Sequence, residues 1–413
     1  QSYSSMFSAK NIVLLTEING FFDASLLHNY MDVILFQLNI LWEIFSQQEE
    51  LKNLVMIIGS SFILQDGMSL VVGIIVDSYS KKKVFFFSIF GFIITVAASY
   101  FINMDIQWAV FYLIFTAVNT LFLRCLVSAA AEMLTTDEFM KYDGITGLFN
   151  QILIIISNVI SGILIKFVSV EAIYFTIIFL LILALFLIFF LPVKDIQGNE
   201  SIKDNEEIKE KIEGSLLLFI KKNIFKDKKI VVFICLLFLL NLDYGYIPNI
   251  LPYYMFKYTS QTSPIFLSLL KSSVNLGEIV ASFFVIHYRK KVSKMTKIGL
   301  LGSAICFMLL PFSNQMILVN FFVLSFYGFF DTLTQPLFSY FVSSIEHKNR
   351  GKILGIVDCV VYLAVPIGMS LGNFISQYGM LILSLSISIV FFCSYILLVK
   401  TKTYKSIDLA GDL

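Results

Sequence analysis

Long apolar segments, each close to 20 residues, recur along almost the whole 413-residue chain. A helix needs about 20 mostly apolar residues to cross the hydrocarbon core of a bilayer. By this measure the predicted spans are 10–36, 53–76, 83–103, 107–131, 143–167, 171–192, 230–256, 264–287, 295–312, 315–342, 352–376 and 379–399. Short breaks with turn-forming or charged residues separate most of them. The pattern predicts an all-α integral membrane protein with twelve transmembrane helices.

The composition supports the same class. Hydrophobic residues make up 58% of the chain and charged residues only 14%, whereas a soluble domain has about 45–50% and about 25%. This much apolar side chain cannot be hidden in a water-soluble core, so we expect the lipid bilayer as a partner. The formal net charge of +1 lacks the strongly basic character of nucleic-acid binders, and we expect no nucleic-acid partner.

The residues that usually carry metal or nucleophilic chemistry are sparse. The 5 cysteines are scattered singly through apolar segments, and there are only 3 histidines. No HExxH or GxxxxGK[ST] pattern occurs, which argues against a zinc site and a built-in ATPase. We therefore predict no metal, no cofactor and no catalytic residues, and a protein that is not an enzyme. Any energy must come from an ion gradient or from the gradient of the substrate.

One long polar stretch, residues 193–229, divides the predicted spans six from six. It holds nine lysines and eight acidic residues, a pattern typical of a solvated linker with some amphipathic helix. The predicted organisation is a six-helix half at 1–192, a cytoplasmic linker at 193–229, and a second six-helix half at 230–413 with a short cytoplasmic tail.

The distribution of Lys and Arg predicts the orientation, because cytoplasmic loops carry the positive excess. With the N-terminus in the cytoplasm, 25 of the 30 Lys and Arg residues fall on the cytoplasmic side. Both termini and the linker are then cytoplasmic. The first apolar segment carries Glu17 and Asp23 and has no small-residue cleavage site, so we expect a mature spanning helix rather than a leader. A composition rich in Ile, Lys, Asn and Phe suggests a bacterial inner or cytoplasmic membrane.

The two halves resemble each other. Lys81-Lys-Lys-Val84 recurs as Arg289-Lys-Lys-Val292, and Gly147-Leu-Phe-Asn150 recurs at the same offset as Gly355-Ile-Val-Asp358. An offset near half the chain length favours a parallel six-plus-six duplication, the arrangement of transporters whose central site lies between their halves.

The loop between the second and third spans carries a recognisable motif. Gly73-Ile-Ile-Val-Asp-Ser-Tyr-Ser-Lys-Lys-Lys-Val84 resembles the G-x-x-x-D-x-x-x-R-K-x signature of the major facilitator superfamily. It matches at Gly73, Asp77, Lys81 and Lys82, with Ser80 in place of the usual glycine. Asn349-Arg-Gly-Lys-Ile-Leu-Gly355 and Ala364-Val-Pro-Ile-Gly368 look most like the macrolide-efflux-type branch of drug:proton antiporters.

This resemblance implies a cytoplasmic gate. The carboxyl group of Asp77 would be stabilised at the N-terminus of the helix that begins near Gly351, and Lys81 and Lys82 would pair with Glu132 or Asp137. The resemblance implies that such contacts close the cytoplasmic side and break during the cycle. Simple positive-inside anchoring is the alternative role of the lysines. The predicted gate residues are Gly73, Asp77, Lys81, Lys82, Glu132 and Gly351.

Ionisable residues inside the predicted spans are the candidates for function, since each is costly in hydrocarbon unless paired or hydrated. Away from the ends of the spans, eight acidic residues and only two basic ones lie there. A carboxyl group that gains and loses a proton near neutral pH is what a proton-coupled carrier needs. Asp23, four residues from Asn19 on one helix face, is the first candidate for a central cavity.

Two further segments carry polar side chains at informative spacings. Lys271, Asn275 and Glu278 form a stripe at i, i+4 and i+7, for which an internal Lys–Glu pair and a substrate contact both remain open. The segment Asn241 to Tyr254 holds a glycine and two prolines that can break a helix where it lines a cavity. The predicted substrate and proton site is Glu17, Asn19, Asp23, Asp66, Asp243, Tyr244, Tyr246, Lys271, Asn275, Glu278, Asp331 and Gln335.

The leading hypothesis is a monomeric secondary active transporter that exports amphipathic small molecules or drugs, with protons as the coupling ion, by alternating access. Acidic and aromatic residues in a central cavity would suit an amphipathic small-molecule substrate that can be cationic. The fifth span reads Ser157-Asn-Val-Ile-Ser-Gly162 where antiporters often have a Gly-Pro motif. A uniporter or importer of a metabolite or peptide therefore remains the first alternative, and a non-transporting membrane sensor the second.

Overall fold

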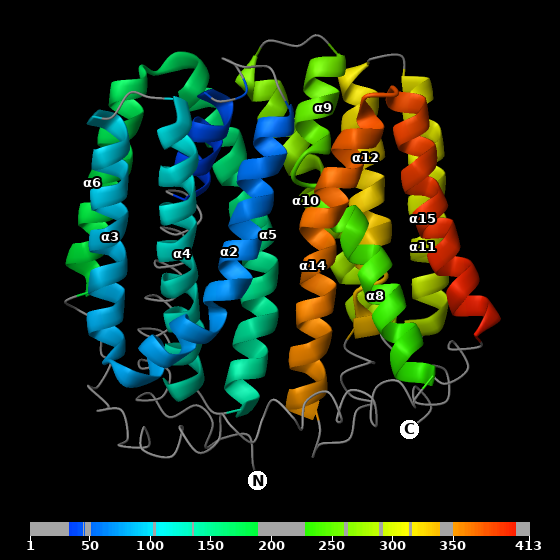
Figure 1. The fold of residues 1–413 in the computed structure, drawn as a ribbon, viewed down its shortest axis with the longest axis horizontal. Helices are drawn as coiled ribbons and strands as arrows, with labels where there is room; N and C mark the ends of the chain where they lie inside the picture. Colours follow the sequence, from blue (N-terminus) through cyan, green and yellow to red (C-terminus); the bar gives the residue numbers. More distant parts are fainter. Residues whose placement is uncertain are drawn as a thin grey trace. The chain divides into compact units, whose positions relative to one another are not determined.

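The computed structural model describes residues 33–43, 45, 51–101, 105–133, 136–188, 228–259, 263–288, 292–313, 316–338 and 350–401. Every regular element in these ranges is helical (Figure 1). After a helix over Val33–Glu43, the elements are α2 (Leu51–Ser78), α3 (Lys81–Phe101), α4 (Asp105–Met133), α5 (Thr136–Phe167), α6 (Val170–Ile188), α8 (Lys228–Tyr246), α9 (Leu251–Tyr258), α10 (Pro264–Tyr288), α11 (Val292–Leu309), η5 (Leu310–Ser313), α12 (Ile317–Thr332), α14 (Arg350–Ser376) and α15 (Met380–Lys400). The described part of the chain is therefore an all-α membrane protein, as predicted.

Seven helical segments in the described ranges are long and apolar enough to cross a membrane. An eighth results if α8 and α9, which are bent by 43° at their junction, form one span. Within the described ranges, the helices follow most of the predicted spans, with three main differences. Helix α12 ends at Thr332, whereas the predicted span continues to residue 342. Residues 37–43 are helical, although the sequence interpretation placed them in a loop, and α5 begins at Thr136 rather than near residue 143. Hydropathy locates the hydrocarbon core, whereas polar residues continue these helices beyond it.

The chain separates into two compact units. The first comprises Gln1–Gln47 and Gly67–Gly198, and the second comprises Gln48–Asp66 and Asn199–Leu413. Helix α2 is thus divided between them. The predicted linker at 193–229 lies outside the described residues, so the predicted domain boundaries stay a prediction.

In the first unit, α3 packs against α4 and α6 (Figure 1). Phenylalanines fill the space between α3 and α4, with the Phe92 and Phe115 ring centroids 4.7 Å apart and those of Phe85 and Phe122 5.4 Å apart. Phe36, from the helix over Val33–Glu43, adds a third contact with its ring 4.3 Å from that of Phe115. This aromatic packing places the helix over Val33–Glu43 beside α4.

In the second unit, glycines hold two helix pairs unusually close. A Cβ atom at Gly245 of α8 would overlap the carbonyl oxygen of Val365 in α14, and one at Gly368 would overlap that of Leu242. The same reciprocal arrangement joins α10 and α12, where a Cβ atom at Gly277 would meet Ser325 and one at Gly328 would meet Val274. Small residues allow this close backbone approach in membrane helices. The two pairs form the frame that positions the polar groups described below.

Prolines interrupt the helices at two places in the second unit. Helix α8 ends at Tyr246, just before Pro248, and the side-chain amide of Asn249 donates hydrogen bonds to the carbonyl oxygens of Gly245 and Tyr244 at 3.1 and 3.4 Å. The chain resumes as α9 with Pro252 in its first turn, which confirms the break predicted between Asn241 and Tyr254. Helix α12 ends at Thr332, before Pro336, because a proline ring clashes with the carbonyl four residues earlier.

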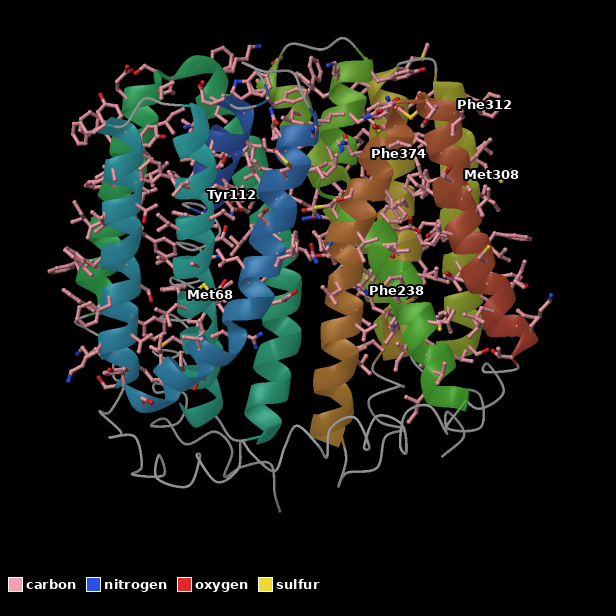
Figure 2. All side chains as sticks on the ribbon, viewed as in Figure 1. Met68, Tyr112, Phe238, Met308, Phe312 and Phe374 are labelled. Atoms are coloured by element: carbon pink, nitrogen blue, oxygen red, sulfur yellow. The ribbon has the colours of Figure 1, made fainter. Side chains whose placement is uncertain are left out.

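The outer surfaces of the helices are apolar. Figure 2 shows the side chains of Met308 and Phe312 projecting outward from the end of α11, and both are more than half exposed. Phe374 of α14, also labelled in Figure 2, is similarly exposed. Such surfaces are stable only in contact with lipid, which agrees with the membrane location.

Candidate functional site

One face of α12 carries the centre of the candidate site. Asn320, Tyr327 and Asp331 follow the spacing i, i+7 and i+11, which places them on one side of the helix. The opposite side presents Leu318 and Phe322, which are exposed. Helix α12 therefore separates a lipid-facing surface from a polar, inward one.

Tyr327 is fixed in position by aromatic neighbours. Its ring lies 5.2 Å from that of Phe307 in α11 and 5.9 Å from that of Phe391 in α15, and the side chain is only 2% exposed. Its hydroxyl group interacts with the carboxyl group of Asp331, one turn further along α12. The packing of three helices thus orients one phenol toward one carboxyl group.

A second carboxyl group reaches the same region from α8. Asp243 is 5% exposed and interacts electrostatically with both Asp331 and Tyr327. Its Oδ2 atom is buried and accepts no hydrogen bond from any residue that the structure describes. Glu278 of α10 also interacts electrostatically with Tyr327. We call Asp243, Glu278, Tyr327 and Asp331 the acidic cluster.

The acidic cluster unites three predicted site residues from three helices. Two like charges in a low-dielectric region disfavour simultaneous ionisation. The acidic cluster is therefore the place in the second unit where described carboxyl groups from three helices come together.

Lys271 lies apart from these carboxyl groups. Its Nζ atom donates a hydrogen bond to the hydroxyl oxygen of Tyr253 at 3.4 Å and lies 5.2 Å from the centre of the Tyr253 ring. Among the described residues, Lys271 makes no ion pair. Of the two interpretations left open by the sequence, an internal pair with Glu278 is thus not formed, and the substrate contact stays a prediction.

The remaining predicted residues of the second unit lie in different surroundings. Tyr246 is buried with its ring against Gly372 of α14, so it packs the α8–α14 interface. Tyr244 is 48% exposed, although it also interacts electrostatically with Tyr327 of the acidic cluster. Asn275 is partly exposed on α10, whereas Gln335 is exposed in the turn after α12. Asp66 lies on an exposed part of α2.

Several predicted residues cannot be placed. Glu17, Asn19 and Asp23 lie outside the described residues. Among the predicted gate residues, the side chains of Asp77 and Glu132 and the surroundings of Gly351 are likewise outside the described part of the structure.

The described gate residues lie where α2 meets α3. Gly73 is in α2, and a Cβ atom there would meet nothing within 4 Å. Lys82 is partly exposed in the first turn of α3. Lys81 is buried, and its Nζ atom donates a hydrogen bond to the carbonyl oxygen of Val76 at 2.7 Å. Lys81 therefore caps the C-terminal end of α2.

Sequence reasoning missed Tyr327 entirely and assigned Tyr253 no specific contact. The signal for Tyr327 was present, because it lies four residues before Asp331 on the same helix face. The contact between Tyr253 and Lys271 had no such local signal, since it joins α9 to α10 across 18 residues. Within the described ranges, no group of three or more His, Cys, Asp or Glu residues could hold a metal ion.

The sequence matches the profile of the Major Facilitator Superfamily over residues 26–368, most of the chain. No curated protein sequence matches it.

Two solved structures have a similar fold. A mutant of the nucleoside transporter NupG superimposes with a TM-score of 0.67 at 12% identity, covering 94% of this chain and 98% of the other. The human organic anion transporter MFSD10 (TETRAN) superimposes with a TM-score of 0.65 at 13% identity, covering 92% and 98%. At these identities, the likeness shows the fold.

Proposed function

The chain belongs to the major facilitator superfamily and is a secondary membrane transporter rather than an enzyme, and from this premise we propose that it is a proton-coupled exporter of amphipathic small molecules. Transport proceeds by alternating access, in which two halves move around a substrate site. The protein acts as a monomer in a bacterial inner or cytoplasmic membrane, with both termini in the cytoplasm.

The acidic cluster carries the proposal of proton coupling. Asp243 and Asp331 come from different helices and interact electrostatically with each other, and both interact with Tyr327. Because an ionised carboxyl group is costly inside a membrane protein, the pair favours holding a proton when no other cation is present. Release of that proton to the side of lower proton concentration supplies the energy for export. The predicted residues Glu17, Asn19 and Asp23 remain candidates for the same pathway.

The similar structures widen the range of substrates that deserve a test. One is named a nucleoside transporter and the other an organic anion transporter. We therefore add nucleosides and organic anions to the macrolides and lipophilic cations that the drug-efflux hypothesis favours.

The decisive experiment uses the purified chain in proteoliposomes that contain a pH-sensitive dye, with an imposed proton gradient. Addition of a transported substrate should produce a proton flux in the wild-type protein. Asp243→Asn and Asp331→Asn should each abolish this flux, because an amide cannot carry the proton. Glu171→Gln is the matched control, since Glu171 is an exposed acid in the first turn of α6.

The possible results separate the alternatives. Substrate movement without proton flux in the wild-type protein would exclude the antiporter and favour a uniporter or importer. Proton flux that both variants retain would exclude the acidic cluster as the coupling site and leave Asp23 as the next candidate. If no member of the panel moves, the proposed substrate class is wrong and the sensor becomes the better hypothesis.

A further inference from the structure

Lys271 is the only lysine described within α10, and it lies well inside that helix. It is seven residues from the first residue, Pro264, which corresponds to about 10 Å along the axis. A lysine ammonium at such a depth requires compensation for lost hydration. The described structure supplies the Tyr253 hydroxyl oxygen, which accepts one hydrogen bond from Lys271, and the face of the same ring, but no carboxylate.

This compensation is incomplete. A cation–π contact offsets only a small part of the cost of burying an unpaired charge. An ammonium group also has three N–H donors, and the described contacts use one of them. Two donors and one positive charge are thus available at Lys271.

The position of Lys271 on α10 places it away from the lipid-facing side of that helix. Leu276 and Val280 are exposed on the lipid-facing side of this helix. Lys271 is five residues from Leu276, and therefore about 140° around the helix from it. Lys271 is partly exposed on this second side, together with Asn275. The ammonium group is therefore not on the side of α10 that carries Leu276 and Val280.

We propose that Lys271, held in place by Tyr253, binds an anionic oxygen group of the transported substrate, such as a carboxylate, sulfonate or phosphate. The inference rests on the proposed function, because it assumes that the chain carries a small molecule. It narrows the substrate class from amphipathic molecules in general to amphipathic organic anions. The substrate supplies the negative charge that the described residues do not place beside Lys271.

The chemistry of binding is a charge-assisted hydrogen bond between the Lys271 ammonium and an anionic oxygen. Such bonds are about twice as strong as neutral ones. The Tyr253 hydroxyl oxygen accepts one N–H of Lys271 and so fixes the direction of the remaining two. Tyr253 is fully buried, which makes this a rigid support. Tyr253 is therefore a positioning residue and Lys271 the binding residue.

Binding measurements on the full-length chain in a neutral detergent test this inference without requiring transport. The probes are 4-phenylbutyrate and 4-phenylbutane-1-sulfonate, each compared with the uncharged 4-phenylbutanamide and the cationic 4-phenylbutylamine. We expect the two anions to bind wild-type protein and raise its unfolding temperature, and the amide and amine to do neither. Lys271→Met should weaken anion binding by about 10-fold to 100-fold, the range for a hydrogen bond to a charged group.

Three further variants separate binding from structural support. Lys271→Arg keeps the charge and should restore most of the anion binding. Tyr253→Phe keeps the ring and removes the hydroxyl, and should weaken anion binding by about threefold. Lys257→Met is the control, because Lys257 is an exposed lysine in the neighbouring helix α9. If Lys271→Met does not fold, two measurements still test the inference. They are the preference of the wild-type protein for anions over the amide and the amine, and the anion affinity of Tyr253→Phe.

An anionic lipid headgroup has the same chemistry as a substrate anion. The binding series is therefore repeated in nanodiscs of phosphatidylcholine alone and of phosphatidylcholine with phosphatidylglycerol. If 4-phenylbutyrate binds with the same affinity in nanodiscs with and without phosphatidylglycerol, Lys271 belongs to a substrate site. Phosphatidylglycerol that displaces 4-phenylbutyrate from wild-type protein, and fails to stabilise Lys271→Met, would assign the site to a lipid and overturn the inference.

Other results overturn it as clearly. Anions that bind no better than 4-phenylbutanamide, or equally well to wild type and Lys271→Met, would exclude an anion site at Lys271. If anions show no selective binding but lipophilic cations drive a proton flux, the proposed proton-coupled export still holds and only the anion site at Lys271 is excluded. Anion-selective binding without proton flux would instead support this site and remove the proton coupling.

Discussion

Gly245 and Gly368 face each other across the α8–α14 interface so closely that a methyl group on either would overlap a backbone carbonyl of the other helix. Asp243 lies two residues before Gly245. The depth and direction of its carboxyl group thus depend on this contact. The glycine pair is part of the support of the acidic cluster, although neither glycine has a side chain to offer.

We predict that Gly368→Ala destabilises the protein by about 1–3 kcal/mol, the usual cost of overpacking a well-packed interior. The added methyl group must displace the carbonyl of Leu242, and backbone cannot move as easily as a side chain. Thermal unfolding in detergent measures the change. Alanine is favoured over glycine by about 1 kcal/mol within a helix, so any net loss reflects the interface.

Gly67→Ala provides the matched control, because a Cβ atom at Gly67 would meet nothing within 4 Å. It should leave the unfolding temperature unchanged or raise it slightly. Equal effects of the two substitutions would show that the close packing of α8 against α14 does not contribute to stability.

A second prediction concerns a hydrogen bond between helices. Ser388 of α15 donates from its hydroxyl to the carbonyl oxygen of Ala304 in α11 at 2.9 Å, and both residues are buried. Hydrogen bonds between membrane helices contribute about 0.6 kcal/mol on average. Ser388→Ala should therefore lower the free energy of unfolding by about 0.5–1 kcal/mol, measured in the same thermal assay.

Ser386→Ala is the comparison for that variant. The Ser386 hydroxyl is exposed and donates to the Ile382 carbonyl of its own helix at 2.8 Å. Its removal should have no measurable effect on stability. A loss as large as that of Ser388→Ala would mean that the contact with Ala304 is not what stabilises α15.

Most of the fold was predictable from the sequence because membrane helices obey a length and hydropathy rule that needs no tertiary information. The break before Pro248 was predictable for a similar reason, since proline acts on its own helix. The ends of the helices were not predictable in this way. Helix α5, for example, begins at Thr136 and not near residue 143. Hydropathy has no signal for a polar turn that extends a helix into solvent.

The candidate site was predictable in its residue types more than in its contacts. Asp243, Glu278 and Asp331 stood out because charge is costly in a membrane. That they surround Tyr327 depends on how α8, α10 and α12 pack, which the glycine contacts determine and the sequence pattern does not reveal. Lys271 illustrates the same limit, since its partner Tyr253 lies beyond the reach of helix periodicity.

A third prediction distinguishes two roles of Lys81. Its Nζ atom donates to the Val76 carbonyl at 2.7 Å, and carbonyl groups in the last turn of a helix have no partner within the helix. Lys81→Met should destabilise the end of α2 by about 1–3 kcal/mol, the cost of leaving a buried acceptor unbonded. Hydrogen exchange of the amides near residues 76–80 should become faster.

Lys83→Met, at an exposed position two residues later, should not change the exchange. Lys81→Arg should restore much of the protection, since a guanidinium group can still donate to the carbonyl. Unchanged exchange in Lys81→Met, combined with altered transport, would argue that Lys81 acts in a gate and not as a helix cap.

A fourth prediction tests the orientation in the membrane. Lys257 lies in α9 and Lys294 near the start of α11, and both are exposed. The excess of Lys and Arg predicts that Lys294 faces the cytoplasm and Lys257 the outside. In a chain whose five cysteines are replaced, Lys257→Cys should react with a membrane-impermeant maleimide on intact cells. Lys294→Cys should react only after permeabilisation.

Reversed labelling would invert the topology and place the Lys271 site nearer the cytoplasm, because α10 follows directly after α9. The same reversal would require protons and substrate to enter the proposed cycle from the opposite sides.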